Sequence, residues 1–495
     1  MFLMLGEKKY HLWLLLAITC CHSVFAQMSV NEDKSVSPTL ATDSLHPLID
    51  TSYITAKPQA LFRVRNIIIE GNKKTRPGII LREITFKPGE SYLLQVLVEK
   101  FEGARKQLMN TALFHTVVVA LKSFDGYDID VLVQVKERWY IFPVPYFKPV
   151  DRNLNQWLVE QKASLKRVNY GVKLLYYNAT GRNDKLKFSA IMGYTKELAL
   201  GYDRLYIDKK MKWGMNFNFS MGKNKEMNYN TINNKQSFLK DENFVRNYKN
   251  FSLEATYRRA IKTRHRIGMA YTMEEVSDTI VKLNPDYFAS SRTRIAYPEV
   301  YYVMSYFDLD YIPYPTKGYA TEINVGKKGF NSMMNLWYLG AKGFGSWTTG
   351  KKSFISVSAS GVIKVPFKQP YYNKRALGYG SLSLQGYEYY VIDGVAGGFL
   401  RTTYTRKLFN FNIKTPGWKK LKPQRIPFTF FGKVYGNTGY IYNPEPGSNF
   451  LSNKMLYTGG FGIDVLTLYD ITIKLEWSFN QLGQNGLFLH RNSIF

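Results

Sequence analysis

The feature that most constrains this chain is an alternation of apolar and polar residues with a period of two, repeated through its C-terminal part. Every second residue from Trp213 to Met221 is large and apolar, with Gly, Asn and Ser between them. The same pattern runs from Ile471 to Phe479, with Thr, Lys, Glu and Ser at the alternate positions. Successive side chains of a β-strand point to opposite faces, so each run has one wholly apolar face. The pattern therefore predicts strands that meet water on one side and lipid or a core on the other.

A membrane β-barrel accounts for these strands better than a soluble fold. Tyr, Phe and Trp make up 16% of the chain, and such rings favour membrane interfaces. The mean hydropathy of −0.26 excludes a helical membrane protein but suits barrel strands, which average an apolar and a polar face. A soluble β-sandwich is the alternative, although it would have to cover its second apolar face. Further alternating runs lie near residues 185–194, 251–260, 265–273, 299–310, 319–326 and 355–365.

The first 60 residues predict a leader and a linker. Residues 1–26 have a charged start, an apolar run too short to span a bilayer and a small-residue site ending at Ala26, which together predict a secretory signal peptide. Both cysteines, Cys20 and Cys21, lie in this leader. A lipoprotein that uses one of them is the alternative; otherwise the mature chain has no thiol. Residues 27–60 hold few large apolar residues and predict a flexible linker.

Residues 61–137 predict a small α+β domain in the order βααββ. The expected elements are a strand at 62–70, a short helix through 77–84, a longer helix at 94–108 and strands at 117–121 and 129–135. Thr75 is the expected N-cap of the first helix, with Pro77 in its first turn. Apolar residues three and four positions apart define the buried face of the second helix. Because both helices cover one sheet face, a strand edge should stay free.

This domain resembles the periplasmic POTRA domain. The resemblance rests on the element order and on Ile69-Glu70-Gly71-Asn72, Leu81-Arg82-Glu83 and Leu113-Phe114. It implies an exposed strand edge that accepts an extended segment of a client protein by β-augmentation, in which main-chain bonds supply the affinity. A folded plug or spacer is the alternative. The sequence holds no second copy of the pattern.

Residues 138–495 resemble the barrel of the BamA/TamA outer-membrane assembly-factor superfamily. Leu384-Gln385-Gly386-Tyr387 resembles the (V/I)RG(F/Y) signature of its inward-folded sixth loop, although a plain tight turn at Gly386 explains the same residues. The other matching features are the turn Asp308-Leu309-Asp310 to Pro315-Thr316-Lys317-Gly318, the strand motif with Asn437 and Gly439, and the terminal aromatic Phe495. The resemblance implies a 16-stranded antiparallel transmembrane barrel, with roughly 22 residues for each strand and its connection.

Two amides replace the charged pair that the family uses to hold its inward loop. Gln385 stands where the family has Arg, and Asn437 stands where it has Asp. Losing one member of such a pair leaves an uncompensated charge, whereas replacing both can be nearly neutral. We therefore expect the amide groups of Gln385 and Asn437 to touch and form an uncharged latch.

Composition and motifs argue against nucleic-acid binding and catalysis. The formal net charge of +29 is scattered along the strands and loops, which favours contacts with lipid phosphates over a nucleic-acid site. The sequence has no histidine pair with metal-ligand spacing, no G-x-S-x-G motif and no Gly-rich phosphate loop. We expect no enzymatic activity, no metal and no cofactor; a barrel-borne lipase with a dispersed Ser/His/Asp site is the alternative.

The resemblance implies an outer-membrane protein that assists the insertion or translocation of other proteins. The expected seam lies between the first strand, which begins near Trp139 and Tyr140, and the last strand, from Leu487 to Phe495. The expected partners are outer-membrane lipids, unfolded client proteins bound at the POTRA edge and accessory assembly subunits. A translocation pore or a structural barrel subunit without insertase activity is the alternative.

Overall fold

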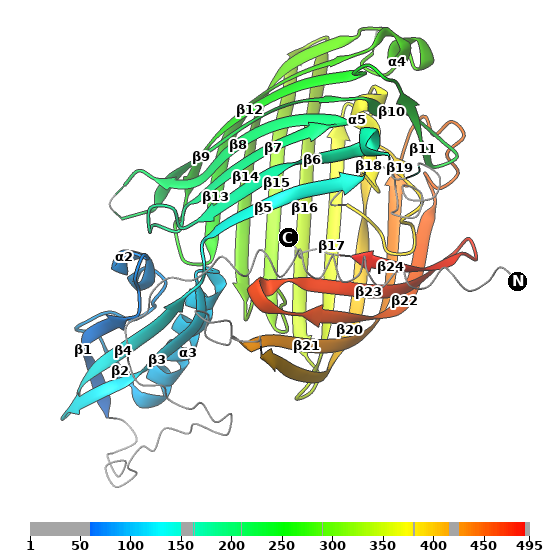
Figure 1. Ribbon diagram of the computed structural model, residues 1–495. Coiled ribbons are helices and arrows are strands. Elements are labelled where there is room, and N and C mark those ends of the chain that lie inside the picture. Colours follow the sequence, from blue (N-terminus) through cyan, green and yellow to red (C-terminus); the bar gives the residue numbers. More distant parts are fainter. Residues whose placement is uncertain are drawn as a thin grey trace, which may run out of the picture.

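The computed structural model describes residues 60–149, 162, 164–208, 210–289, 291–379, 382–414 and 425–490. They form a small N-terminal domain and a 16-stranded barrel, with the domain at one end of the barrel (Figure 1). The expected signal peptide at 1–26, most of the expected linker and Phe495 lie outside the described residues.

The N-terminal domain is a four-stranded sheet in the order β2-β1-β4-β3, packed against two helices. Its elements are β1 (Leu61–Glu70), α2 (Pro77–Leu81), β2 (Ser91–Leu93), α3 (Leu94–Asn110), β3 (Phe114–Asp125) and β4 (Asp128–Glu137). The buried residues of α3 recur every three or four positions from Leu97 to Leu108, as the periodicity predicts. They form one core with Ile79 and Ile80 of α2 and the apolar face of the sheet.

Two local predictions for this domain are wrong. The N-cap of α2 is Arg76, without a side-chain cap bond, and the Thr75 hydroxyl lies instead 3.2 Å from the Tyr140 hydroxyl. The strand β2 was not expected, because three residues are too few for a periodic signal; it pairs with Leu61–Arg63. The order is therefore βαβαββ, and the two sheet edges are the short β2 and the longer β3.

The remaining chain forms one antiparallel sheet of 16 strands, which confirms the expected fold class. In chain order the strands are β5 (Ile141–Pro149), β6 (Val168–Tyr177), β7 (Lys185–Gly193), β8 (Thr195–Tyr206), β9 (Trp213–Asn224), β12 (Arg246–Tyr257), β13 (Thr263–Val276), β14 (Arg294–Leu309), β15 (Gly318–Asn331), β16 (Met334–Thr348), β17 (Ser353–Val365), β20 (Ala396–Lys414), β21 (Arg425–Tyr442), β22 (Met455–Leu466), β23 (Thr472–Asn480) and β24 (Asn485–His490).

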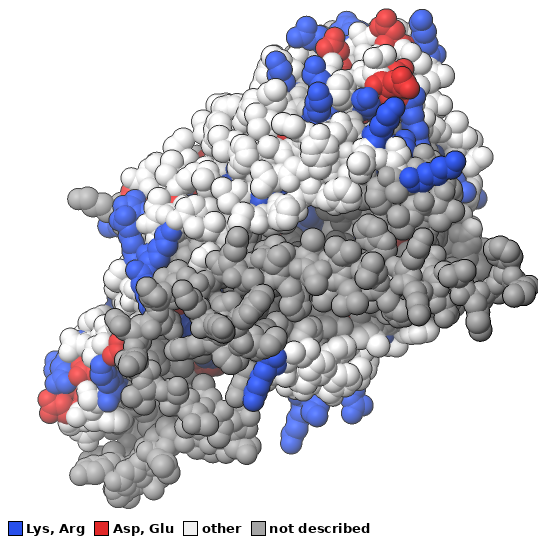
Figure 2. Space-filling view, in the orientation of Figure 1, with Lys and Arg blue, Asp and Glu red and all other residues white. Residues whose placement is uncertain are grey.

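Burial in the barrel wall is inverted relative to a water-soluble protein. Along β23, the apolar side chains from Ile473 to Phe479 are between 37% and 45% exposed, whereas Thr472, Glu476 and Ser478 between them are at most 7% exposed. The apolar row therefore faces outward and the polar row faces the lumen. On the face in Figure 2, charged side chains gather toward the two ends of the molecule, and the part of the wall that is visible between them is largely uncharged. This arrangement suits an outer-membrane-type barrel surrounded by lipid.

Long loops form a packed cap at the end away from the N-terminal domain (Figure 1). Its elements are β10 (Glu226–Ile232), β11 (Lys235–Lys240), α4 (Asp278–Leu283), α5 (Tyr371–Lys374), β18 (Arg375–Leu377) and β19 (Ile392–Asp393). Tyr287 and Phe288 pack with Tyr371 and Tyr372 in its core. None of the described helices is long and apolar enough to cross a membrane.

The first and last strands, β5 and β24, are the two ends of the barrel sheet (Figure 1). β5 pairs with β6, and β24 pairs with β23. Within the described residues, no ladder of backbone hydrogen bonds joins β5 to β24. We call the junction between these two strands the seam.

Candidate functional site

The loop between β17 and β20 enters the barrel lumen and packs against the strands at the C-terminal end of the sheet. Leu384 and Tyr387 are 1% and 2% exposed and lie in a core with Ile441 and Leu456 of the wall. Gly386 between them has φ of 90°, a backbone conformation that favours glycine. The turn allows the backbone to approach β23, where the Asn480 side chain donates to the Gly386 carbonyl at 2.8 Å.

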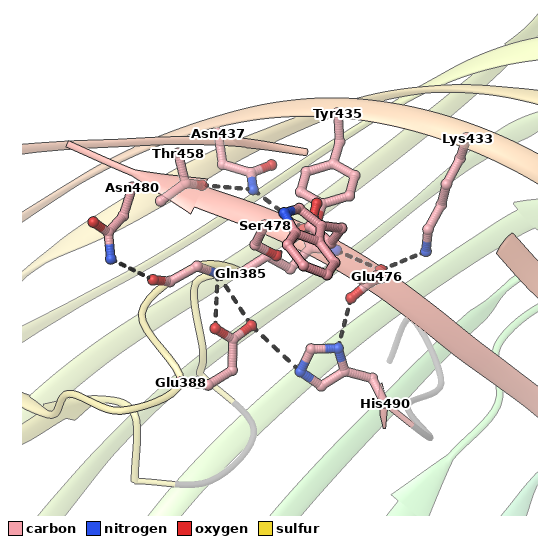
Figure 3. Close-up of polar contacts among 12 residues, drawn as sticks. Gln385, Glu388, Lys433, Tyr435, Asn437, Thr458, Glu476, Ser478, Asn480 and His490 are labelled. Atoms are coloured by element: carbon pink, nitrogen blue, oxygen red, sulfur yellow. Dashed lines mark hydrogen bonds and ion pairs between the residues drawn. The ribbon is translucent and has the colours of Figure 1, made fainter. Parts of the chain in front are cut away.

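The expected contact between the two amides is present. The Asn437 Nδ2 of β21 donates to the Gln385 Oε1 at 3.2 Å and to the Thr458 Oγ1 of β22 at 3.0 Å (Figure 3). The loop is thus joined to two neighbouring strands through one side-chain amide.

The expectation that this latch is uncharged is wrong. The Gln385 Nε2 donates to the Glu476 Oε1 of β23 at 2.6 Å, and Glu476 is 1% exposed. Glu476 also forms an ion pair with Lys433 of β21, which lies 2.5 Å from Asp464 of β22. The carboxylate that binds the loop residue therefore comes from a strand other than that of Asn437, and a buried lysine neutralises it. Such charge-assisted bonds are stronger than amide–amide bonds.

His490 links this cluster to the last strand of the barrel. Its Nδ1 lies 2.6 Å from the Glu476 Oε2, and its Nε2 lies 3.5 Å from the Glu388 carboxylate of the loop (Figure 3). Glu388 in turn accepts the Gly386 amide at 2.9 Å. Beside them, the Tyr389 ring packs on Phe488 of β24 with 5.5 Å between centroids. The loop therefore braces β24 from the lumen side; we call these contacts the loop brace.

At the other end of the barrel, the N-terminal domain is held to the turns between strands by buried polar contacts. Arg258, after β12, donates to both Glu83 carboxylate oxygens at 2.5 and 2.6 Å, and Glu83 is 2% exposed. Burial alone would raise the pKa of Glu83, but the hydrogen bonds and charge of Arg258 hold that pKa below its usual value. Arg138 makes a second bidentate pair, with Asp470 in the turn before β23.

The POTRA model of the family described as "Surface antigen variable number repeat" matches residues 62–138. Residues 62–138 are a POTRA domain. Among solved structures, CdiB from Escherichia coli aligns with a TM-score of 0.50 at 11% identity, over 87% of this chain and 74% of that chain. BamA from Haemophilus ducreyi lacking POTRA domains 1-3 aligns with a TM-score of 0.47 at 14% identity, over 87% and 83%. No curated protein matches the sequence.

The POTRA domain and the 16-stranded barrel together give the chain the architecture of the BamA/TamA-like superfamily. At these identities the likeness to the solved structures concerns the fold. The roles of individual residues are therefore argued from the contacts of this chain.

The turn motif from Asp308 to Gly318 lies against the POTRA domain, and its Tyr314 hydroxyl donates at 3.0 Å to Asp464, the partner of Lys433. The Asp310 carboxylate accepts the amides of Thr316 and Lys317 at 3.0 and 3.1 Å, which fixes the turn. Asp308 pairs with Lys262 at 2.8 Å, and Gly318 has φ of 109° where β15 begins, after Pro315. Asn110 of the POTRA helix α3 donates to the Leu309 carbonyl at 3.0 Å and accepts the Ile312 amide at 2.9 Å. The motif thus forms part of the surface through which the POTRA domain contacts the barrel, together with Arg258 and Asp470. We call this surface the POTRA docking face.

The expected seam residues Trp139 and Tyr140 are not part of the seam strand. β5 begins at Ile141, and the Tyr140 ring is 8% exposed in the POTRA core, where its hydroxyl donates to the Leu113 carbonyl at 3.1 Å. The indole of Trp139 donates to the Ile141 carbonyl. Aromatic residues before a strand resemble its first residues in sequence, and only the packing places them between the domains. Leu487 lies on β24, as expected.

Sequence reasoning missed the charged members of the loop brace. Glu476, Lys433 and His490 lie on three strands, and each looks like an ordinary lumen-facing residue in its own alternating run. The available signal was Glu476, a carboxylate on the polar face of a strand that is otherwise lined by Thr, Lys and Ser. Within the described residues, no group of three His, Cys, Asp or Glu side chains is arranged to hold a metal ion.

Proposed function

We propose that this protein is an outer-membrane barrel that assists the insertion or translocation of other proteins, without catalysis, through its POTRA domain and its seam. The observation that carries the proposal is the seam itself. Fifteen adjacent strand pairs have backbone ladders, whereas the described residues of β5 and β24 have none between them. Unpaired backbone groups are costly in lipid, so a wall that lacks a ladder is the place where an incoming strand gains most.

The POTRA domain supports the handling of extended client segments on the periplasmic side. Its sheet ends in β3 on one side and in the three-residue β2 on the other. β2 covers only Leu61–Arg63 of β1, so most of β1 has a ladder only with β4 in the described chain. An extended segment that adds to such an edge needs no particular sequence, which suits a domain that meets many unfolded clients.

The loop brace supports the last strands at the seam, where the described residues of β5 and β24 have no ladder between them. Gln385, Glu388 and Tyr389 hold β21, β23 and β24 from the lumen, so the last strands have support that does not depend on β5. The packed cap of outer loops lies at the far end of the barrel (Figure 1). In this arrangement a client reaches lipid sideways through the seam.

A translocation pore or a structural subunit is the second candidate. One observation favours it: the described chain has a single POTRA domain. In this candidate the loop leaves the lumen and opens a channel. Conductance of the purified protein in a planar bilayer discriminates, because a braced and capped barrel is nearly silent and an open pore is not.

A disulfide lock of the seam tests the proposal. With Cys20 and Cys21 in the predicted leader, the mature protein offers no competing thiol. One cysteine is placed between Ile141 and Tyr146 and its partner between Leu487 and His490, with each single-cysteine variant as control. Depletion of other outer-membrane proteins in cells that carry only the locked form supports insertion through the seam. Normal levels of every other outer-membrane protein would leave the pore or structural candidate.

A further inference from the structure

Two neighbouring strands continue past the rim of the barrel as a two-stranded ribbon, at the end that carries the POTRA domain (Figure 1). β20 pairs with β17 only as far as Arg406 and then continues to Lys414. The first residues of β21, from Arg425 onward, likewise precede its pairing with β22. The two strands remain paired with each other throughout. We call residues 407–414 and the opposite residues 425–430 the ribbon.

A β-bulge decides which face of the ribbon points outward. The register between the two strands shifts between Lys407 and Phe409, so β20 holds one extra residue, Leu408. Before the bulge, even-numbered residues of β20 such as Tyr404 lie on the outer side of the wall. After it, odd-numbered residues lie there, because Phe409 is opposite Phe430 of the outer row of β21. The bulge therefore keeps the phenylalanines of β20 on the lipid side, where an unbroken alternation would have placed asparagines.

Four phenylalanines stack on this outward face. Phe409 packs on Phe430 with 4.7 Å between ring centroids, and Phe411 packs on Phe428 with 5.6 Å. Phe409 and Phe411 are 53% and 42% exposed, and Ile413 beyond them is 48% exposed. The opposite face of β20 carries only polar side chains: Asn410, Asn412 and Lys414. The ribbon is therefore amphipathic, with an aromatic face and a polar face.

The aromatic face of the ribbon needs a cover that the described chain does not supply. A two-stranded hairpin without neighbouring strands is marginally stable in water, and a contiguous exposed apolar surface marks a contact with something else. The face continues the outer row of β21 without a break in alternation, through Phe430 to Val434, which is 53% exposed in the barrel wall. Lipid covers that row in the wall. The same lipid therefore reaches the ribbon without crossing a polar boundary.

The rim beside the ribbon is cationic. The turn between β16 and β17 holds Lys351 and Lys352, and the Lys407 amide donates to the Lys352 carbonyl at 2.7 Å, so this turn lies against the base of the ribbon. Arg406 and both turn lysines are exposed. The sequence has no Asp or Glu in residues 349–353, 404–414 and 425–431. In Figure 2, the coloured side chains along the lower edge of the barrel are Lys or Arg. Cations beside an apolar face favour the phosphates of acidic lipids.

We propose that the ribbon is a membrane anchor on the POTRA side of the barrel. Its phenylalanine face enters the bilayer leaflet beside the barrel, and Lys351, Lys352 and Arg406 bind the phosphates of acidic phospholipids. The occupant is phospholipid because the aromatic face continues a lipid-facing row and the adjoining charges are all positive. The anchor lies on β20 and β21, away from the seam between β5 and β24. It goes beyond the proposed function and holds for a pore as well as for an assembly factor.

Spin labels on adjacent residues test which face of the ribbon meets lipid. With both native cysteines in the predicted leader, the full-length mature protein carries one label, at Phe411→Cys or at Asn412→Cys. The protein is placed in nanodiscs with equal amounts of phosphatidylglycerol and phosphatidylcholine. Oxygen concentrates in lipid, whereas a nickel chelate stays in water. We expect the ratio of oxygen to nickel accessibility to be about tenfold higher at position 411 than at position 412, because only the first side chain faces lipid. Ile473→Cys in the outer row of β23 supplies the value for full lipid contact.

Two results of this experiment overturn the proposal. The first is a label at position 411 that is as accessible to nickel as the label at position 412, because the aromatic face then lies in water. The second is a label at position 411 that is shielded from oxygen and nickel alike, because a protein surface then covers the face. Dipolar broadening between labels identifies that surface as a second copy, and its absence assigns the cover to another part of the same chain.

Lipid quenching tests the role of the cations. A fluorophore on Phe411→Cys is quenched by brominated acyl chains, carried in one sample by the phosphatidylglycerol and in the other by the phosphatidylcholine. We expect the acidic lipid to quench about threefold more strongly, and K351Q/K352Q/R406Q to remove this preference. K235Q/K240Q, on the hairpin of β10 and β11 at the far end of the barrel, is the matched control and should keep it. Equal quenching by both lipids before any lysine or arginine is replaced, or a preference that survives K351Q/K352Q/R406Q, overturns the proposal.

Discussion

The POTRA docking face and the seam differ in how the chain distributes its polar contacts. At the docking face, buried bidentate pairs join Glu83 to Arg258 and Arg138 to Asp470, and Asn110 makes two bonds to the turn that follows β14. At the seam, the described strands β5 and β24 share no ladder. The junction between the two domains is therefore the firmer one, although a domain junction is usually where a protein moves. Under the proposed function, the POTRA domain is then the fixed entrance and the barrel wall is the part that opens.

Glu83→Ala should have the largest effect on docking of the POTRA domain, because it removes a buried ion pair between that domain and the barrel. It leaves Arg258 buried beside Arg82 and Arg264 without their carboxylate, a loss of about 4 kcal/mol in docking free energy. The POTRA domain should then detach, and trypsin should release it by cleavage near Arg138 in the folded protein.

Glu102→Ala is the matched control for that experiment, since Glu102 pairs with Arg105 on the exposed face of α3. Its effect should be below about 1 kcal/mol. A trypsin-resistant Glu83→Ala protein would show that the docking face does not depend on this pair, and the contrast with the seam would lose its main support.

Glu476→Gln weakens the loop brace on the other side of the comparison. Lys433 keeps Asp464, but the ion pair with Lys433 and the bond to His490 lose their charge, at a cost of about 2–3 kcal/mol. The loop should become mobile and β24 should lose its support. Spin labels on the loop and on β16 should report a broader distance distribution, and channel openings should become more frequent. Asp203→Asn on β8, in the more exposed pair with Lys187 of β7, controls for loss of a carboxylate elsewhere in the wall.

The sequence predicts those parts of the fold that repeat locally. Alternation along β9 and β23 indicates barrel strands because each residue's face is set by its neighbours two positions away. The periodicity of α3 indicates the POTRA core for the same reason. The three-residue β2 and the environment of Thr75 were beyond prediction. The strand is too short to repeat an alternating pattern, and the environment of Thr75 depends on Tyr140, 65 residues later.

The site required information that no local pattern contains. Contact between Gln385 and Asn437 followed from a substitution argument, but Glu476 belongs to a third element, and its role depends on the register between β21, β22 and β23. Pro143 and Pro145 are visible in the sequence. Only the register of β5 against β6 shows that their missing amides leave that ladder intact, because the same prolines one position later would interrupt it.

Gly386→Ala should weaken the loop brace by a smaller amount. The alanine would have to keep the backbone φ of 90°, and its methyl group would lie 3.1 Å from the Phe479 carbonyl oxygen. Together these effects should cost about 1–2 kcal/mol. The spin-label distances should broaden in the same direction as in Glu476→Gln, but less. Gly436→Ala in β21, where an added methyl group meets nothing within 4 Å, is the control. Equal broadening in both variants would mean that the turn at Gly386 does not hold the loop.

His115 offers the mildest way to loosen the docking face, by pH alone. Its ring packs on Tyr469 of the barrel turn with 5.3 Å between centroids, and burial, together with the charges of Arg138 and Lys136, lowers the pKa of His115 to about 4, against the opposing effect of Asp470. A histidine held neutral in the fold contributes stability that is complete above pH 6.5 and is lost as the pH falls toward 4. Because the ring is only half-buried, solvent screening limits the loss to about 1 kcal/mol.

Distances between labels on the POTRA domain and the barrel should therefore lengthen as the pH falls from 6.5 to 4. His115→Phe keeps the ring packing but does not titrate, so it should flatten this response. If His115→Phe responds to acid as strongly as the wild type, another group controls docking, and the firmness of this face comes from its ion pairs alone.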